Sequence, residues 1–122
     1  MIQIRDPEYR NQSCAMQLAI SIIRRKWNIV LILALRCGAK RFGALQRQLA
    51  PISKKVLAER LQDLERIGLV QRRVLSVKPY QVEYMLTDLG RNLLPILSQL
   101  QQWGADTLQG LRASDSGGAG SE

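Results

Sequence analysis

The sequence of 122 residues contains no histidine, only two cysteines, and few aromatic residues (5%). Without histidine, the chain lacks the side chain that most often serves as a general base or a metal ligand. Two cysteines are too few for a disulfide framework or a zinc site. Neither a glycine-rich phosphate loop nor a G-x-S-x-G elbow appears. We therefore expect no enzyme activity, no catalytic residue, no cofactor and no metal.

Long hydrophobic runs are also missing. The longest, Ile29–Leu35, is far shorter than the roughly 20 apolar residues that a membrane-spanning helix needs. The first residues are charged and lack the apolar run of a secretory signal. We expect a cytoplasmic protein that makes no contact with membranes, with a length suited to a single domain.

Negative charge is absent from a large part of the chain. No acidic residue occurs between Asn11 and Ala58, although lysine and arginine are frequent there, and the net charge of the whole chain is +8. Cations concentrated in one part of a chain favour an anionic partner, such as the phosphates of nucleic acid. The amino-terminal half is therefore the predicted phosphate-facing side.

Three helical segments are predicted before residue 50. Ser13–Arg25 has apolar residues on a helical period, and Trp27–Cys37 is almost entirely apolar and is followed by Gly38. The second pattern is typical of a helix that is buried on most sides and forms the centre of a core. Arg41–Leu49 is short and amphipathic, and Pro51 ends it.

The following segment carries signals for both ends of a helix. Ser53 is a favoured N-cap, and Gly68 is the residue type usually found just past a C-terminus. Its leucines recur on one face, so we expect Lys54, Lys55 and Arg60, and the carboxylates of the helix, on exposed faces. Two short helices joined by a tight turn, the second basic at its start, indicate a helix-turn-helix, whose second helix can lie in a DNA major groove.

After Gly68 the period changes from helix to strand. Leu69–Ser76 is rich in valine and leucine, and Gln81–Leu86 alternates between apolar and polar residues. Lys78 lies in the turn-forming tip between them. A β-hairpin directly after the second helix is a wing, so the predicted fold is a winged helix-turn-helix, mainly α with a small β-hairpin.

The end of the chain reads as a long helix and a tail. Thr87 is a good N-cap for a last helix. This helix has more apolar residues than a peripheral helix needs, so we expect part of it to meet another subunit. From Ala113 on, small and polar residues predict a disordered tail. The predicted organisation is an arm over residues 1–12, a winged-helix domain over 13–112 and a tail over 113–122.

The two cysteines receive different interpretations. At the first turn of a helix, Cys14 would feel the positive end of the helix dipole, with Arg10 close in sequence, and both effects favour the thiolate of a redox or electrophile sensor. The alternative for Cys14 is an inert, buried, small hydrophobic residue. Cys37, at the end of the apolar segment, is expected to be structural.

Many residues of this chain occur together, in the same order, in one known family. They are Cys14, Lys26-Trp27, Arg41-Phe42 with Leu45, Ile52-Ser53 with Lys55 and Leu57, Arg60-Leu61 with Leu64-Glu65, Gly68-Leu69-Val70, Val82-Glu83-Tyr84 with Leu86-Thr87, Gly90, Leu94-Pro95 and Trp103-Gly104. With them, the chain resembles the HxlR-type winged helix-turn-helix transcriptional regulators of bacteria, within the MarR-like group, over roughly residues 13–104.

The resemblance implies a transcriptional regulator that binds double-stranded DNA as a homodimer at a pseudo-palindromic operator. The dimer would form through the first and last helices. Several members of the family sense electrophiles or oxidants through a cysteine at the position of Cys14, which implies such a molecule as effector. It also implies that the helix from Ser53 is the recognition helix and that Lys78 lies near the wing tip. We predict that Ser53, Lys54, Lys55 and Arg60 act in or beside the major groove, that Arg41 contacts a phosphate and that Lys78 reaches the backbone or the minor groove.

Two other classes of protein stay open at this point. A winged helix also serves as a protein-interaction module that binds no DNA, because fold alone does not settle function. The basic, acid-free span argues against that alternative. An enzyme needs catalytic groups that the sequence does not show.

Overall fold

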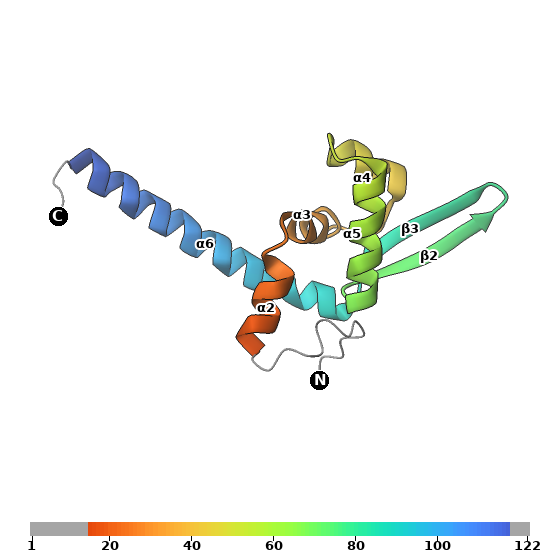
Figure 1. The fold of residues 1–122 in the computed structure, drawn as a ribbon, viewed down its shortest axis with the longest axis horizontal. Coiled ribbons are helices and arrows are strands. Elements are labelled where there is room, and N and C mark those ends of the chain that lie inside the picture. The colour runs from red at the N-terminus through yellow and green to blue at the C-terminus, as the bar shows by residue number, and fades with distance from the viewer. Residues whose placement is uncertain (1–14, 118–122) are drawn as a thin grey trace. The chain divides into compact units, whose positions relative to one another are not determined.

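The computed structural model describes residues 15–117, and the chain divides between Arg91 and Asn92 into two compact units. Helix α6 starts in the first unit and continues through the second (Figure 1). The elements in chain order are α2 (Ala15–Ile23), α3 (Lys26–Ala34), β1 (Lys40–Arg41), α4 (Phe42–Gln48), α5 (Lys54–Ile67), β2 (Val70–Val77), β3 (Tyr80–Leu86) and α6 (Asp88–Gly117).

The core of the first unit is built around α3 and α5, which pack against each other. Leu31 and Ile32 of α3 and Leu57 of α5 are completely buried. This confirms the prediction that the apolar segment after Trp27 is the central helix. The helix also buries a polar residue that the sequence pattern did not single out. The Asn28 side chain is fully buried, and its Nδ2 donates a hydrogen bond to the Ile22 carbonyl at 3.0 Å, which ties the end of α2 to α3.

Helix α5 begins and ends where the sequence predicted. The Ser53 hydroxyl accepts a hydrogen bond from the Val56 backbone N–H at 3.1 Å, so Ser53 is a true N-cap. Gly68 adopts a left-handed conformation with φ of 96°, and its N–H donates to the Leu64 carbonyl at 3.1 Å. The preceding helix α4 and this one form the predicted helix-turn-helix.

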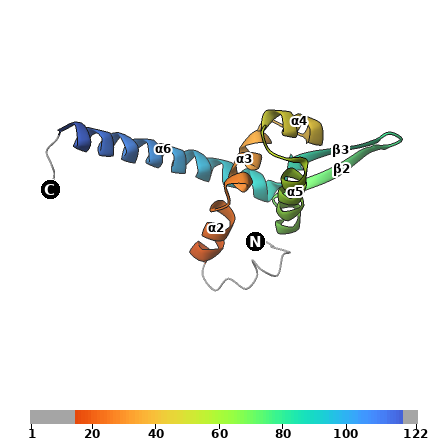
Figure 2. The ribbon, with the colours of Figure 1, turned by 45° about the horizontal axis from the view of Figure 1, so that its top comes forward.

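The hairpin of β2 and β3 is the predicted wing. The strands pair antiparallel from Val70 opposite Leu86 to Val77 opposite Tyr80, with a tight turn at Lys78–Pro79. In both views the tip of the hairpin points away from α4 and α5 (Figure 1, Figure 2). Burial is limited to the base of the hairpin, at Val70 and Leu86, so the alternation of β3 is not matched by an alternation of burial.

The sequence did not predict strand β1. Its two residues pair with β3 on the side away from β2, with Lys40 opposite Tyr84 and Arg41 opposite Glu83. A strand this short leaves no alternating pattern, and only its partner, far along the chain, reveals it.

Helix α6 starts as predicted but ends later. The Thr87 hydroxyl accepts a hydrogen bond from the Gly90 N–H at 3.1 Å and donates one to the Gly68 carbonyl at 2.6 Å, which connects the start of α6 to the end of α5. The helix continues to Gly117, past Ala113, where we expected the tail, because alanine, serine and aspartate are tolerated in helices. The predicted arm and residues 118–122 lie outside the described residues. Within residues 15–117, no helix is long and apolar enough to cross a membrane.

Candidate nucleic-acid interface

The first turn of α5 is the most cationic part of the helix-turn-helix. Ser53, Lys54 and Lys55 are all exposed there, and no acidic residue lies in this turn. The free backbone N–H groups and the positive end of the dipole favour an anion at a helix start, and two lysines strengthen this preference. Because the Ser53 hydroxyl acts as acceptor in its cap, its proton is still available to donate to a phosphate oxygen.

Arg60 does not lie on the exposed face that the sequence predicted for it. Its side chain is only 20% exposed, and its Nη1 lies 3.3 Å from Oδ2 of Asp63 in an ion pair. Arg60 is four residues after the half-buried Val56 and three after the fully buried Leu57, which places it at the edge of the buried face. Its guanidinium is therefore directed to a carboxylate of its own helix.

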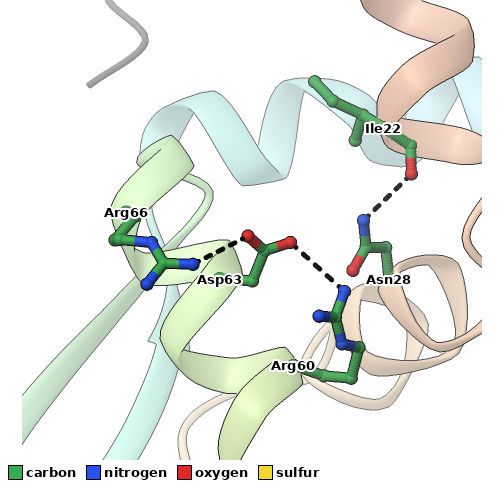
Figure 3. A network of polar contacts seen from close by, with 5 residues as sticks. All are labelled: Ile22, Asn28, Arg60, Asp63 and Arg66. Atoms are coloured by element: carbon green, nitrogen blue, oxygen red, sulfur yellow. Dashed lines mark hydrogen bonds and ion pairs between the residues drawn. The ribbon is translucent and has the colours of Figure 1, made fainter. Parts of the chain in front are cut away.

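The expectation that all carboxylates of the helices are exposed is wrong for Asp63. Its side chain is 9% exposed, and its oxygens hold Arg60 on one side and Arg66 on the other, each at 3.3 Å (Figure 3). The physical reason is the spacing, since residues three positions away in both directions face the same side of a helix. Two guanidiniums then offset the cost of burying one carboxylate.

The exposed face of α5 contains two polar residues that the sequence patterns did not single out. Glu59 and Gln62 are exposed and follow Lys55 by four and seven positions, so all three lie on one face of the helix. A glutamine amide pairs with an adenine edge and a carboxylate accepts from the cytosine amino group, whereas lysine suits guanine. Helical spacing counted from Lys55 was the signal that would have found this row.

Arg41 and Lys78 belong to other elements of the same unit. Arg41 is exposed, belongs to β1 and directly precedes α4, which agrees with its expected place at the start of that helix. Lys78 is exposed in the turn of the hairpin. Glu83, opposite Arg41 in the sheet, is ion-paired with Arg73 of β2. Strand β1 therefore links the start of α4 to the wing.

The wing carries a further cation to which the sequence assigned no role. Arg72 is exposed on β2, and its Nη1 donates a hydrogen bond to the Tyr80 hydroxyl at 3.0 Å. This hydrogen bond raises the pKa of the Arg72 guanidinium above its usual value. Nearby on β3, burial raises the pKa of the Tyr84 phenol, which stays neutral at physiological pH.

The structure describes only one of the two cysteines. Cys14 lies outside the described residues. Cys37 is an exposed free thiol, which corrects the expectation of a structural residue. The reason is that α3 ends at Ala34, so Cys37 falls in the turn that follows. Among residues 15–117, no three side chains of cysteine, aspartate, glutamate or histidine gather to hold a metal ion.

The two helices α4 and α5 pack one face into the core, the start of α5 is cationic and exposed, and a β-hairpin wing follows. This arrangement defines the class of winged helix-turn-helix proteins. The model of the family described as "HxlR-like helix-turn-helix" matches residues 22–111, and the chain belongs to this family. This confirms the family that the residues suggested.

The names of similar proteins agree with this family assignment. The chain is 36% identical over 88 residues to the uncharacterized HTH-type transcriptional regulator YvaP of Bacillus subtilis, covering 72% of this chain and 82% of that protein. The reduced form of the transcriptional regulator YodB from B. subtilis superposes with a TM-score of 0.69 at 38% identity, covering 75% of this chain and 91% of that one. YodB has also been solved with a quinone bound.

A redox regulator is among the similar structures. HypR in its oxidized form gives a TM-score of 0.68 at 35% identity, covering 76% of this chain and 96% of that one. The chain is a helix-turn-helix transcriptional regulator, as the sequence predicted. These relatives are named as transcriptional regulators, and none supports the alternative of a protein-interaction module.

Proposed function

We propose that this regulator binds double-stranded DNA in the cytoplasm as a homodimer at a pseudo-palindromic operator, with α5 as the recognition helix. The observation that carries the proposal is the start of α5. The side chains of Ser53, Lys54 and Lys55 are exposed at this helix start, and the first turn contains no acidic residue. The opposite face of the helix is buried in the core. A helix held in this way presents its first turns to the major groove.

The exposed residues divide into two roles. Ser53, Lys54 and Arg41 suit phosphate contacts, which position the protein and supply affinity that depends on salt. Lys55, Glu59 and Gln62 form the row that suits base edges, which supply sequence choice. Lys78, at the wing tip, suits the phosphate backbone or the minor groove. Arg60, held by Asp63, serves the helix itself in this assignment.

Selection of bound sequences from a random DNA pool tests the proposal directly. We expect the wild type to enrich one sequence with two related halves. On that sequence Lys55→Ala should lose about 1–3 kcal/mol and relax the preference at one base pair of each half. The matched variant Lys54→Ala should weaken binding to all sequences alike. No binding of duplex at low salt would defeat the proposal, and full selectivity in Lys55→Ala would remove Lys55 from the base-reading row.

We further propose that Cys14 is the sensor of this regulator. Support comes from the similarity to the redox regulator HypR and to YodB, whose structure is known with a quinone. The Cys14 thiolate would add to a ring carbon of the quinone, forming a sulfur–carbon bond while the electron pair of the ring C=C bond moves towards a carbonyl oxygen. That oxygen takes up the proton that the thiol gave up, and the hydrogen of the attacked ring carbon moves to the second oxygen, which leaves a hydroquinone thioether. Such an adduct at the start of the chain would change the separation of the two recognition helices, which must match the helical repeat of DNA.

The two-thiol composition of the chain provides the control for this test. We expect benzoquinone to lower operator binding of the wild type and of Cys37→Ser, but not of Cys14→Ser, in a titration followed by fluorescence anisotropy. Cys37→Ser is the necessary partner because the free thiol of Cys37 is exposed to the same reagent. If Cys14→Ser responds as the wild type does, Cys14 is not the switch.

A further inference from the structure

Asp63 is the buried carboxylate of the described part of the chain, and it lies in the proposed recognition helix. Oδ2 accepts from Nη1 of Arg60 and Oδ1 accepts from Nη2 of Arg66, both at 3.3 Å (Figure 3). Each carboxylate oxygen therefore holds one guanidinium. All three residues belong to α5, so the two ion pairs do not depend on how α5 is placed relative to DNA.

The two arginines differ in their surroundings. The Arg66 side chain is 56% exposed, whereas that of Arg60 is 20% exposed. A guanidinium that has lost most of its water is stable only when a counter-charge compensates for the lost hydration. Asp63 is the carboxylate paired with Arg60 in the structure, so the carboxylate keeps Arg60 at the edge of the core.

We propose that Asp63 is a positioning residue that withholds Arg60 from DNA and thereby lowers the affinity of α5 for DNA of any sequence. This inference rests on the proposed function of α5 as the recognition helix. Every cation that reaches a phosphate adds affinity that does not depend on sequence. A regulator must discriminate its operator from a large excess of other sites, so the ratio of specific to nonspecific affinity matters more than affinity alone. Asp63 improves this ratio by keeping one cation away from the phosphates.

The salt dependence of binding to a duplex of arbitrary sequence measures how many phosphates the protein neutralises, because the slope of log K against log salt is proportional to that number. The variants are Arg60→Gln, Asp63→Asn and the double variant, with Lys54→Gln as the positive control and Asp63→Glu as the conservative rescue. Circular dichroism establishes that each protein is folded. A purely structural role of Asp63 would change stability but not the slope.

We expect Arg60→Gln to keep the wild-type slope. Lys54→Gln should make the slope shallower by about 0.9 for each phosphate that is no longer neutralised. Asp63→Asn should make the slope steeper by about the same amount for each phosphate that the released Arg60 neutralises. The double variant should return to the wild-type slope, and Asp63→Glu should keep it.

A slope that falls as far in Arg60→Gln as in Lys54→Gln would overturn the proposal, since Arg60 would then already bind DNA in the wild type. An unchanged slope in folded Asp63→Asn would overturn it as well. If Asp63→Asn does not fold, Asp63→Ser, which also removes the carboxylate from Arg60, takes its place with the same expected slope. A wild type that binds no duplex at all would overturn the proposed function and this inference with it, whereas normal wild-type binding separates the two.

Discussion

At the scale of single residues, Gly90 decides how closely α6 approaches the end of α5. A Cβ atom at this position would lie 2.2 Å from the Leu69 carbonyl oxygen and 3.2 Å from a methyl carbon of Leu86. The neighbour at the shorter distance is backbone, which cannot move aside as a flexible side chain does. Gly90 also donates the hydrogen bond that Thr87 accepts at the start of α6. Glycine is therefore required here for space.

We expect Gly90→Ala to lower the free energy of unfolding by about 1–3 kcal/mol, since an added methyl group in a packed site forces neighbours apart. Urea denaturation followed by circular dichroism measures the change. Gly43→Ala in α4 is the control, where an added Cβ would meet only the end of the flexible Arg47 side chain, at 3.5 Å. That change should be neutral or stabilising by up to about 1 kcal/mol, because alanine favours helix. Equal midpoints for the two variants would contradict the steric argument.

At the scale of elements, the sequence predicted what depends on near neighbours. Both ends of α5 were predicted correctly because Ser53 and Gly68 act through hydrogen bonds to residues three or four positions away. The hairpin was predicted from its alternation and its turn. Strand β1 was missed because its pairing with Tyr84 and Glu83 joins distant parts of the chain.

The faces of α5 were predicted only in part. The leucine period placed the core side correctly, and Leu57, Leu61 and Leu64 are buried. It did not predict how far the side chains of Arg60 and Asp63 are buried. Both lie at the edge of the leucine face, where hydrophobic periodicity does not determine whether a side chain is buried or exposed. There the ion pair determines which way each side chain turns.

At the scale of the whole molecule, α6 has an apolar row that the structure leaves exposed. Ile96, Leu100 and Trp103 recur at helical spacing, and Trp103 is 66% exposed. On α2, Met16 and Ile20 are exposed in the same way. A helix with so large an exposed apolar face favours burial against another chain. We propose that these faces form the homodimer, in agreement with the expectation from the sequence.

Placing a charge in this row tests the dimer. We expect Trp103→Glu to shift the protein from the mass of two chains to that of one in sedimentation equilibrium, because a carboxylate in an apolar interface loses its hydration without a partner. Ser98→Glu adds the same charge at an exposed position on the opposite side of α6 and should leave the dimer intact. A single-chain mass for the wild type would refute the dimer.

The sequence by itself determined the caps of α5, the order of helices and wing, the family and the cationic start of α5. These depend on residue type and on spacings of a few residues, which a linear chain displays. Only the tertiary structure decided that Arg60 turns inward to Asp63, that Asn28 is buried against Ile22, that Cys37 is exposed and that β1 joins the sheet. Each of these depends on which surfaces are covered by the folded chain, and burial is settled by neighbours that are distant in sequence.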